Sequence, residues 1–227
     1  MNEQKIFYRR HLPHWHPPGA TYHVVFRLAG SLPKEVVVEL RNESEATRRR
    51  LERIKDEKEK ERLLNEHEWI YFKKFDALLD RGTFGPTWIK QPQIAITVKE
   101  DLHCRDGKEC DLLAYSIMPN HVHVVFELVG QDSSRAEENG RAETRPTFPV
   151  TNLLRLIKGS TARTCNDLLY RSGAFWQHES YDHVIRSSQE LERTIWYVLN
   201  NPVKAGLVNS WKGWEWTYCK PGLIVLM

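Results

Sequence analysis

The chain has 227 residues, of which 41% are hydrophobic and 28% charged, and its formal net charge is +3. A chain of this length can bury a sizeable core without disulfides or structural metals, so we expect one domain over residues 1–227. The near balance of 33 basic and 30 acidic side chains excludes a uniformly basic surface. Any binding of nucleic acid would therefore depend on local positive charge.

Cysteine spacing and hydropathy predict a reduced, cytoplasmic protein. The chain holds four cysteines and no Cys-x-x-Cys pair, and its first ten residues contain no apolar signal core. No apolar run approaches the ~20 residues that a membrane-spanning helix needs. His103, Cys104 and Cys110 have no second ligand pair at the spacing of a zinc site, so we interpret them as a helix end and a loop.

The segment 6–18 is rich in histidine, arginine and proline. It contains a His-x-His pair, His14 and His16, but the two prolines directly after the pair remove the strand that would fix its geometry. We interpret the segment as a loop, with metal binding as a minor alternative. In this loop Arg9 and Arg10 are available to phosphate groups.

Residues 19–28 alternate in polarity and predict a first strand that ends at Gly30. Side chains two apart leave a strand on the same face. The residues expected on the core face are Tyr22, Val24, Phe26 and Leu28.

The stretch from 33 to about 80 predicts a long, charged helical insertion after this strand. Residues 41–62 include 9 basic and 7 acidic side chains, a balance typical of a solvated face. An apolar stripe from Trp69 to Leu79 predicts that a later helix packs on the core. The oppositely charged pairs that favour exposed helix are Glu45 with Arg49 and Asp56 with Lys60.

Residues 93–103 predict a helix that opens at Pro92. Residues 111–117 alternate like a strand, and the turn at 118–120 leads directly into another alternating segment at 121–126. These two strands are expected to form a hairpin.

The stretch 130–149 is polar and poor in large apolar residues, which predicts a flexible loop. A helix is expected over 151–170 and a strand region over 175–185. Ser187 and Glu190 make a capping box at the start of a last helix.

Together these elements predict an α+β protein. The order strand, helix, strand, strand, helix, strand is that of a ferredoxin-like antiparallel sheet, βαββαβ. One further helix follows at the C-terminal end, and the charged helices at 33–80 are an insertion after the first strand.

His121 and His123 stand two residues apart in the predicted strand, so their side chains leave on the same face. Two imidazoles placed in this way can converge on one divalent cation. Val122 and Val124 then point the other way, into the core.

A second motif lies far downstream. The sequence Met-Pro-Asn-His-Val-His at 118–123 and the sequence Tyr-x-x-x-Asn-Pro-Val-Lys-Ala-Gly-Leu-Val at 197–208 together resemble the REP-associated tyrosine transposases, a branch of the single-tyrosine HUH transposases. The resemblance runs from 19 to 208. The charged helices and the loop at 130–149 look like insertions in it.

By this resemblance, His121 and His123 hold Mg²⁺ or Mn²⁺, and Tyr197 is the catalytic nucleophile on the C-terminal helix. The resemblance implies a metal-dependent transposase that nicks and joins single-stranded DNA through a 5′-phosphotyrosine intermediate. Phosphoryl transfer needs an in-line nucleophile and stabilised charge on the phosphate oxygens, and a metal site beside a phenol supplies both.

Asn201 lies one helical turn after Tyr197. The resemblance makes it a third metal ligand, whereas Pro202 favours a helix end there and a capping role for its side chain. Tyr181 is the competing nucleophile because it also precedes the last helix and lies beside Asp182 and His183. Only Tyr197 has Asn-Pro four residues later.

The expected partner is single-stranded or hairpin-forming, REP-like DNA, and the protein is expected to act as a monomer or a homodimer. A domesticated protein that binds DNA hairpins without cutting them is the alternative function. The DNA sequence, the preferred metal and the choice between an active site within one chain or across two remain open. The residues predicted to contact DNA are Arg9, Arg10, Arg155, Lys158, Arg163, Arg186, Arg193 and Lys204.

Overall fold

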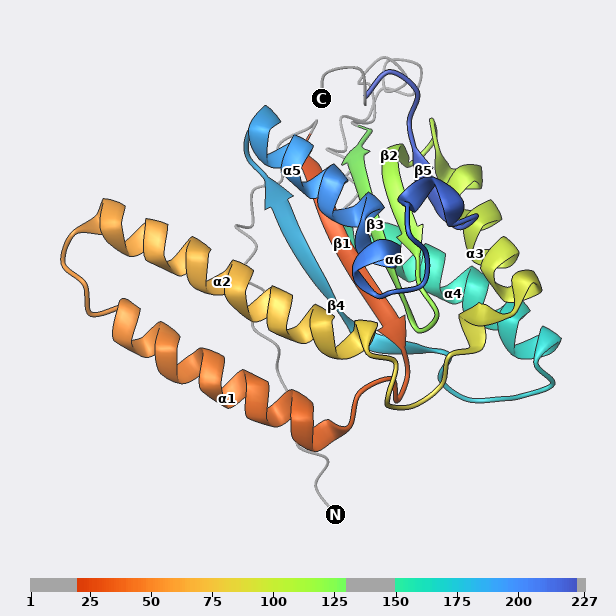
Figure 1. Cartoon of the computed structure of the whole chain (residues 1–227), viewed down its shortest axis with the longest axis horizontal. Coiled ribbons are helices and arrows are strands. Elements are labelled where there is room, and N and C mark those ends of the chain that lie inside the picture. The colour runs from red at the N-terminus through yellow and green to blue at the C-terminus, as the bar shows by residue number, and fades with distance from the viewer. Residues whose placement is uncertain (1–19, 130–149, 224–227) are drawn as a thin grey trace, which may run out of the picture.

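A five-stranded antiparallel sheet forms the centre of the protein, in the order β4-β1-β3-β2-β5 (Figure 1). The computed structural model describes residues 20–129 and 150–223. The predictions for Arg9, Arg10, His14, His16 and the loop at 130–149 concern residues outside these ranges. The strands are β1 (Thr21–Leu28), β2 (Cys110–Ile117), β3 (His121–Leu128), β4 (Trp176–Ile185) and β5 (Thr217–Cys219).

The helices lie on both faces of this sheet, so the central strands β1, β2 and β3 are buried on two sides. The helices α3 and α4 cover one face, while α2, α5 and α6 lie over the other. No helix in the described part of the chain is long and apolar enough to cross a membrane. The helices are α1 (Lys34–Leu51), α2 (Glu57–Asp80), α3 (Pro92–Arg105), α4 (Val150–Leu168), α5 (Ser188–Leu199) and α6 (Asn201–Lys204).

The predicted α+β class and ferredoxin-like order are confirmed. The first four strands follow the order 4-1-3-2, and every neighbouring pair is antiparallel. The register sets Val24 opposite Val124 and Phe26 opposite Val122. Because the alternation of β1 and β3 matches across the pair, the aliphatic and aromatic side chains meet in one core under α3 and α4.

Three details differ from the sequence predictions. The short strand β5 beside β2 was not predicted, because three residues are too few to show alternation. The prediction that Asp56 and Lys60 form an ion pair is wrong. Asp56 instead caps α2 by accepting a hydrogen bond from the Glu59 amide, and Lys60 pairs with Glu57. The short helix α6 also follows the end of α5.

The predicted Ser187 cap is confirmed, because its Oγ accepts from the Glu190 amide at 3.2 Å. In a capping box the Glu190 carboxylate would accept from the amide of Ser187 itself. Here it accepts from the preceding amide, that of Arg186, at 2.7 Å. Glu190 also bonds His183 Nε2 at 2.7 Å. The start of α5 is thereby tied to β4.

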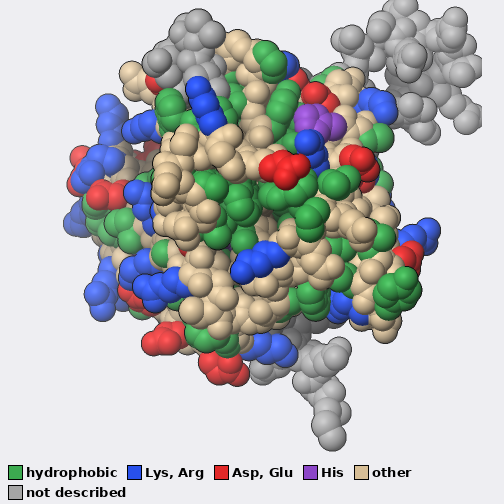
Figure 2. All heavy atoms as spheres, turned by 45° about the vertical axis from the view of Figure 1, so that its right-hand side comes forward, with side chains coloured by type: hydrophobic (Ala, Val, Ile, Leu, Met, Phe, Trp, Pro, Cys, Tyr) green, Lys and Arg blue, Asp and Glu red, His purple; other side chains and the backbone are tan. Residues whose placement is uncertain are grey.

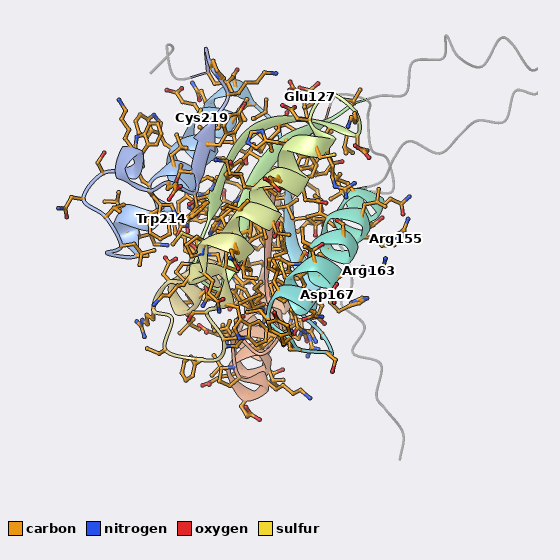
Figure 3. The ribbon with its side chains drawn as sticks, turned by 90° about the vertical axis from the view of Figure 1, so that its right-hand side faces the viewer. Glu127, Arg155, Arg163, Asp167, Trp214 and Cys219 are labelled. Atoms are coloured by element: carbon orange, nitrogen blue, oxygen red, sulfur yellow. The ribbon has the colours of Figure 1, made fainter. Side chains whose placement is uncertain are left out.

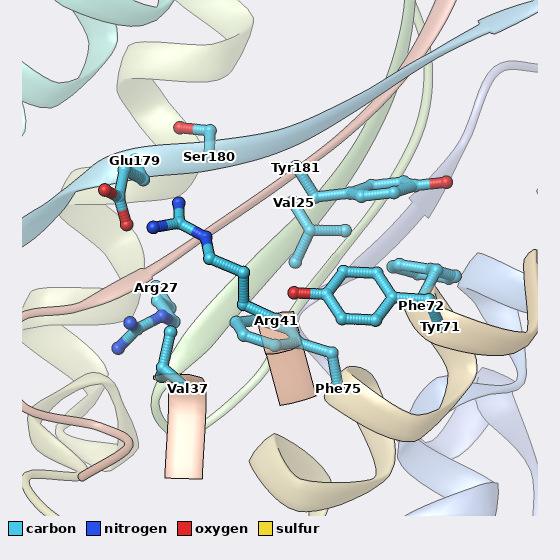
Figure 4. Close-up of a pocket in the computed structure, with 10 residues that line it drawn as sticks. All are labelled: Val25, Arg27, Val37, Arg41, Tyr71, Phe72, Phe75, Glu179, Ser180 and Tyr181. Carbon is cyan, nitrogen blue, oxygen red and sulfur yellow. The ribbon is translucent and has the colours of Figure 1, made fainter. Parts of the chain in front are cut away.

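The charged insertion forms a helical hairpin, α1 and α2, and only its second helix reaches deep into the protein. Phe72 and Leu79 of α2 are 1% exposed, whereas α1 has no buried residue. Figure 4 shows Arg27 and Arg41 beside Tyr71 and Phe75, around a cavity of about 50 Å³ between the hairpin and the sheet. Such a volume suits a few water molecules.

The C-terminal end of α2 is anchored by a contact between two glycines. Gly85 has φ +66°, and a Cβ at this position would lie 2.0 Å from the Gly30 carbonyl oxygen at the end of β1. Only glycine allows both this conformation and this approach. The contact fixes where α2 lies along the sheet.

We expect Gly85→Ala to destabilise the protein by more than about 3 kcal/mol, because backbone overlap adds to left-handed strain. Gly107→Ala is the matched control: its φ is +72° and its Cβ would meet nothing within 4 Å. That variant should lose only about 1 kcal/mol. Urea unfolding of both proteins measures the difference, and equal losses would show that the Gly30 contact carries no energy.

Candidate active site

The two histidines of the His-Val-His motif lie on the face of β3 that α2 and α5 cover. His121 and His123 are 0% exposed, and their Nε2 atoms lie 3.0 Å apart. Val122 and Val124 point to the opposite core, as the alternation predicts. The strand therefore brings two ring nitrogens to one point.

Each imidazole is oriented by a partner on its other nitrogen. His121 Nδ1 bonds Asn120 Oδ1 at 2.6 Å, and His123 Nδ1 bonds His23 Nε2 at 3.3 Å. Asn120 is itself fixed by donating to the Leu79 carbonyl at 3.0 Å. Partners of this kind set the tautomer and the ring direction of metal-binding histidines.

Two carboxylates from the inserted helix α2 join the histidine pair. Asp76 Oδ1 lies 3.1 Å from His123 Nε2 and 3.7 Å from His121 Nε2. Asp80 lies further out, with Oδ1 3.8 Å from His121 Nε2, and its Oδ2 pairs with Lys204 at 2.8 Å. Asp76, His121 and His123 thus offer three ligand atoms within 4.8 Å of one another.

Neither Asp76 nor His23 was predicted from the sequence. A signal was present for Asp76, because this polar residue follows the spacing of a buried face. Asp76 lies four residues after Phe72, on the apolar stripe of α2. His23 alternates with the core residues Tyr22 and Val24 in a strand that turns out to be covered on both sides.

Asn201 is fully buried at the first position of α6 and reaches the same point. Its Nδ2 lies 3.0 Å from His123 Nε2 and 3.3 Å from Asp76 Oδ2. The helix α5 ends at Leu199, so the break expected before Pro202 is present. A half-turn of the Asn201 amide would exchange its nitrogen and oxygen and turn the oxygen toward the imidazoles.

Buried acceptors in this cluster fit a divalent cation. Asp76 Oδ1 and Asn201 Oδ1 are buried and have no hydrogen-bond partner among the described residues. Unsatisfied buried acceptors are costly, and a cation removes that cost. Imidazole nitrogen, carboxylate and amide oxygen are a donor set suited to Mn²⁺, and the oxygens also suit Mg²⁺.

Burial and charge set the protonation of the cluster. Burial, followed by the neighbouring His123, lowers the pKa of His121 to about 3, so its ring is neutral. Burial alone would raise the pKa of Asp76, but His123, His121 and Lys204 outweigh it and hold that pKa well below the usual value. The Asp76 carboxylate is therefore charged and available to a cation.

Tyr197 lies in the same cluster, within one chain. Its hydroxyl donates to Asp76 Oδ2, and Lys204 Nζ lies 3.1 Å from the phenol oxygen. Its ring centroid is 6.1 Å from that of His123. Burial and the charge of Asp76 raise the pKa of Tyr197, so the phenol is protonated in this arrangement.

Tyr181, the competing nucleophile, lies on β4 on the far side of Phe72. Its ring stacks on Phe72 at 4.3 Å and is 6.1 Å from the ring of His23. The histidine pair is thus separated from Tyr181 by other rings, whereas Tyr197 shares Asp76 with it. The geometry favours Tyr197.

The residues predicted to contact DNA lie in different places. Arg186 and Arg193 are exposed at the start of α5, and Lys204 lies in the cluster itself. The Lys158 ammonium donates to the Gln177 and His178 carbonyls and to Ser180 Oγ. Lys158 therefore ties α4 to β4.

Arg155 and Arg163 lie on α4, on the sheet face opposite the histidines (Figure 3). Figure 2 shows basic and acidic side chains interspersed over the face it presents, with no single basic field. Arg186, Arg193 and Lys204 are the predicted contacts nearest the cluster.

The structure is a ferredoxin-like α+β protein in which a buried histidine pair, a carboxylate and the tyrosine of the following helix lie together. The resemblance to REP-associated tyrosine transposases is confirmed by comparison. Over 107 residues the chain is 26% identical to a protein of Haemophilus influenzae named as a candidate REP-associated tyrosine transposase.

This match covers 47% of the chain and 57% of the relative, so the chain spans little more than half of that protein. A solved structure of a REP-associated tyrosine transposase bound to a REP hairpin has a TM-score of 0.48 and 15% identity, covering 91% of this chain and 80% of that one. No family model matches the chain.

We expect Asp76→Asn to weaken Mn²⁺ binding more than tenfold, because the variant removes the charge of a ligand that faces both imidazoles. Asp80→Asn is the matched control, since Asp80 lies 3.8 Å from one imidazole and is paired with Lys204. It should weaken binding less. Calorimetric titration of Mn²⁺ measures both, and equal losses would argue against Asp76 as a ligand.

The stability of the metal-free protein should fall as the pH drops below about 6.5. Burial lowers the pKa of His121 to about 3 and that of His23 well below 6.5, so the unfolded chain takes up protons first. Asp80 opposes this loss of stability, because burial and the charge of Asp76 raise its pKa to about 6. As the pH drops below that value, the folded protein takes up the Asp80 proton before the unfolded chain does.

We therefore expect His121→Gln to flatten the pH dependence of stability between pH 6.5 and 4, and Asp80→Asn to steepen it. Each group changes the slope by up to about 1.4 kcal/mol per pH unit. Urea unfolding with EDTA at several pH values measures the slopes. Two variants with unchanged slopes would show that neither group titrates as described.

Proposed function

We propose that the protein is a metal-dependent transposase that nicks and joins single-stranded DNA, with Tyr197 as its nucleophile. The observation that carries this proposal is the sharing of Asp76: one oxygen faces the histidine pair and the other accepts from the Tyr197 hydroxyl. A phenol, a cation site and a lysine thus meet at one buried point. This set supplies the nucleophile and the positive charge that phosphoryl transfer requires.

His121, His123 and Asp76 would hold the cation, with Asn201 as a further oxygen ligand. A bound Mg²⁺ or Mn²⁺ ion would stabilise charge on the non-bridging phosphate oxygens. His23 and Asn120 position the two imidazoles. His121, His123, Asp76 and Asn201 are buried, which limits the access of water to the cation site.

The chain's own residues provide for the phenol proton. Asp76 Oδ2 already accepts the hydrogen bond from Tyr197 and is placed to take the proton as the phenol attacks. The ammonium of Lys204 stabilises the charge that develops on the phenol oxygen, from 3.1 Å. It also pairs with Asp76 at 2.9 Å.

The reaction exchanges one phosphate ester for another. Tyr197 forms a bond to phosphorus, the bond from phosphorus to the 3′-oxygen breaks, and that oxygen leaves as a hydroxyl with a proton in place of the one the phenol lost. Attack of a 3′-hydroxyl on the 5′-phosphotyrosine reverses these steps and joins two strands. The ester conserves the bond energy, so ATP is not required.

The proposed substrate is single-stranded DNA beside a hairpin. The name of the Haemophilus influenzae relative, a REP-associated tyrosine transposase, supports this choice of DNA. Arg186 and Arg193 are exposed beside α5 and would contact the backbone phosphates.

We expect Tyr197→Phe to abolish the covalent protein–DNA adduct, because the attacking oxygen is removed while the ring and its packing remain. Tyr181→Phe is the matched control and should still form the adduct. The assay uses hairpin oligonucleotides with single-stranded flanks from the DNA around the coding sequence, incubated with Mn²⁺ and resolved on denaturing gels.

An adduct that survives in Tyr197→Phe and disappears in Tyr181→Phe would overturn the assignment of the nucleophile. Hairpin binding by the wild-type protein without any nicking would instead point to the alternative, a protein that binds DNA hairpins and does not cut them.

A further inference from the structure

A hollow of about 360 Å³ lies beside the candidate site, between the inserted helix α2, strand β4 and the start of α5. Ligand sites in proteins begin at about this size. Its wall includes Trp69, Tyr181 and His23. The rings of Trp69 and His23 contact the Tyr197 ring edge to face, and the Tyr181 ring contacts His23 in the same way. The ring centroids of Trp69 and Tyr197 are 5.3 Å apart, so the hollow adjoins the nucleophile.

The hollow combines an aromatic wall with polar groups. Trp69 is 36% exposed, although it lies on the buried side of α2 and stacks on Phe72 at 5.5 Å. A large aromatic side chain with a third of its surface open is a platform for another flat ring. Across from it, Ser187 and the bonded pair His183 and Glu190 supply hydrogen-bonding atoms.

Charged side chains of both signs line the hollow. The carboxylates are Glu68 and Glu190, and Glu190 is engaged by His183 and by the Arg186 amide. Of the two arginines, Arg193 lies on α5, and Arg186 lies just before it and bridges to α2 through Asn65 Oδ1 at 3.2 Å. An aromatic platform bordered by arginines is the combination that binds unpaired nucleotides, because the rings stack on bases and the guanidinium groups attract phosphates.

We propose that this hollow binds one unpaired DNA base next to the cleaved phosphate, with the base stacked on Trp69 and the backbone held by Arg186 and Arg193. The inference rests on the proposed function and adds a site for the nucleotide that flanks the cut. By fixing that nucleotide, the hollow would place the phosphate against Tyr197.

The test compares oligonucleotides with and without bases. Fluorescein-labelled 12-mers of dA, dC and dT, and a 12-mer of abasic residues, are titrated with the full chain in EDTA, and binding is read by fluorescence anisotropy. Without a divalent cation no cleavage is expected, so the measurement does not depend on catalysis. The wild-type protein should bind at least one base-bearing 12-mer more tightly than the abasic one.

Trp69→Ala should weaken binding of that base-bearing 12-mer by about 5- to 150-fold, the range of one base stacked on an aromatic ring, and leave the abasic 12-mer unchanged. Trp196→Ala is the matched control, because Trp196 is also 36% exposed but does not line the hollow. It should change neither affinity. Arg193→Gln should weaken both kinds of 12-mer alike.

Equal losses for base-bearing and abasic 12-mers in Trp69→Ala, or wild-type affinities that do not depend on the bases, would overturn the inference. Thermal unfolding of Trp69→Ala and Trp69→Phe separates loss of the fold from loss of the platform, since Phe keeps a ring and should retain part of the preference. Failure of the proposed function would appear separately, as an absent covalent adduct with Mn²⁺.

Discussion

The burial of two imidazoles on one face of β3 is the constraint on which the site depends. Because the other face of this strand carries Val122 and Val124 in the main core, a one-residue slip of β3 would turn the histidines into that core and the valines into the site. The same register fixes His121 and His123. Buried polar groups need partners, and the rest of the cluster supplies them to the two imidazoles.

The inserted helix α2 supplies the carboxylates and aromatic rings that surround the histidine pair. Trp69, Phe72, Asp76 and Asp80 follow one another at spacings of three and four residues, so they lie along one face of the helix. Phe72 packs on His23 and His123, and Asp76 links the histidines to Tyr197. The helix whose apolar stripe was predicted to pack on the core therefore also brings two carboxylates to the histidine pair.

The sequence alone predicted the sheet order, the histidine pair and the tyrosine, because each follows a local period or a motif. Asp76 and His23 were missed, since their roles depend on which faces of α2 and β1 become covered, and that depends on packing between distant segments. Lys158 was predicted to contact DNA. In the structure its ammonium donates to carbonyls of β4, a contact between distant segments that the sequence of one helix does not reveal.

The glycine contact at the end of α2 gives the two ends of the hairpin different tolerance to length change. At the tip, 52–56, the chain lies far from the sheet, so extra residues there would only lengthen two solvated helices (Figure 1). Inside α2, one added residue between Trp69 and Asp80 would rotate one part of the helix by ~100° relative to the other, so that its site-facing side chains would no longer share one face. Natural variation among similar chains should therefore concentrate at the tip and spare the anchored end.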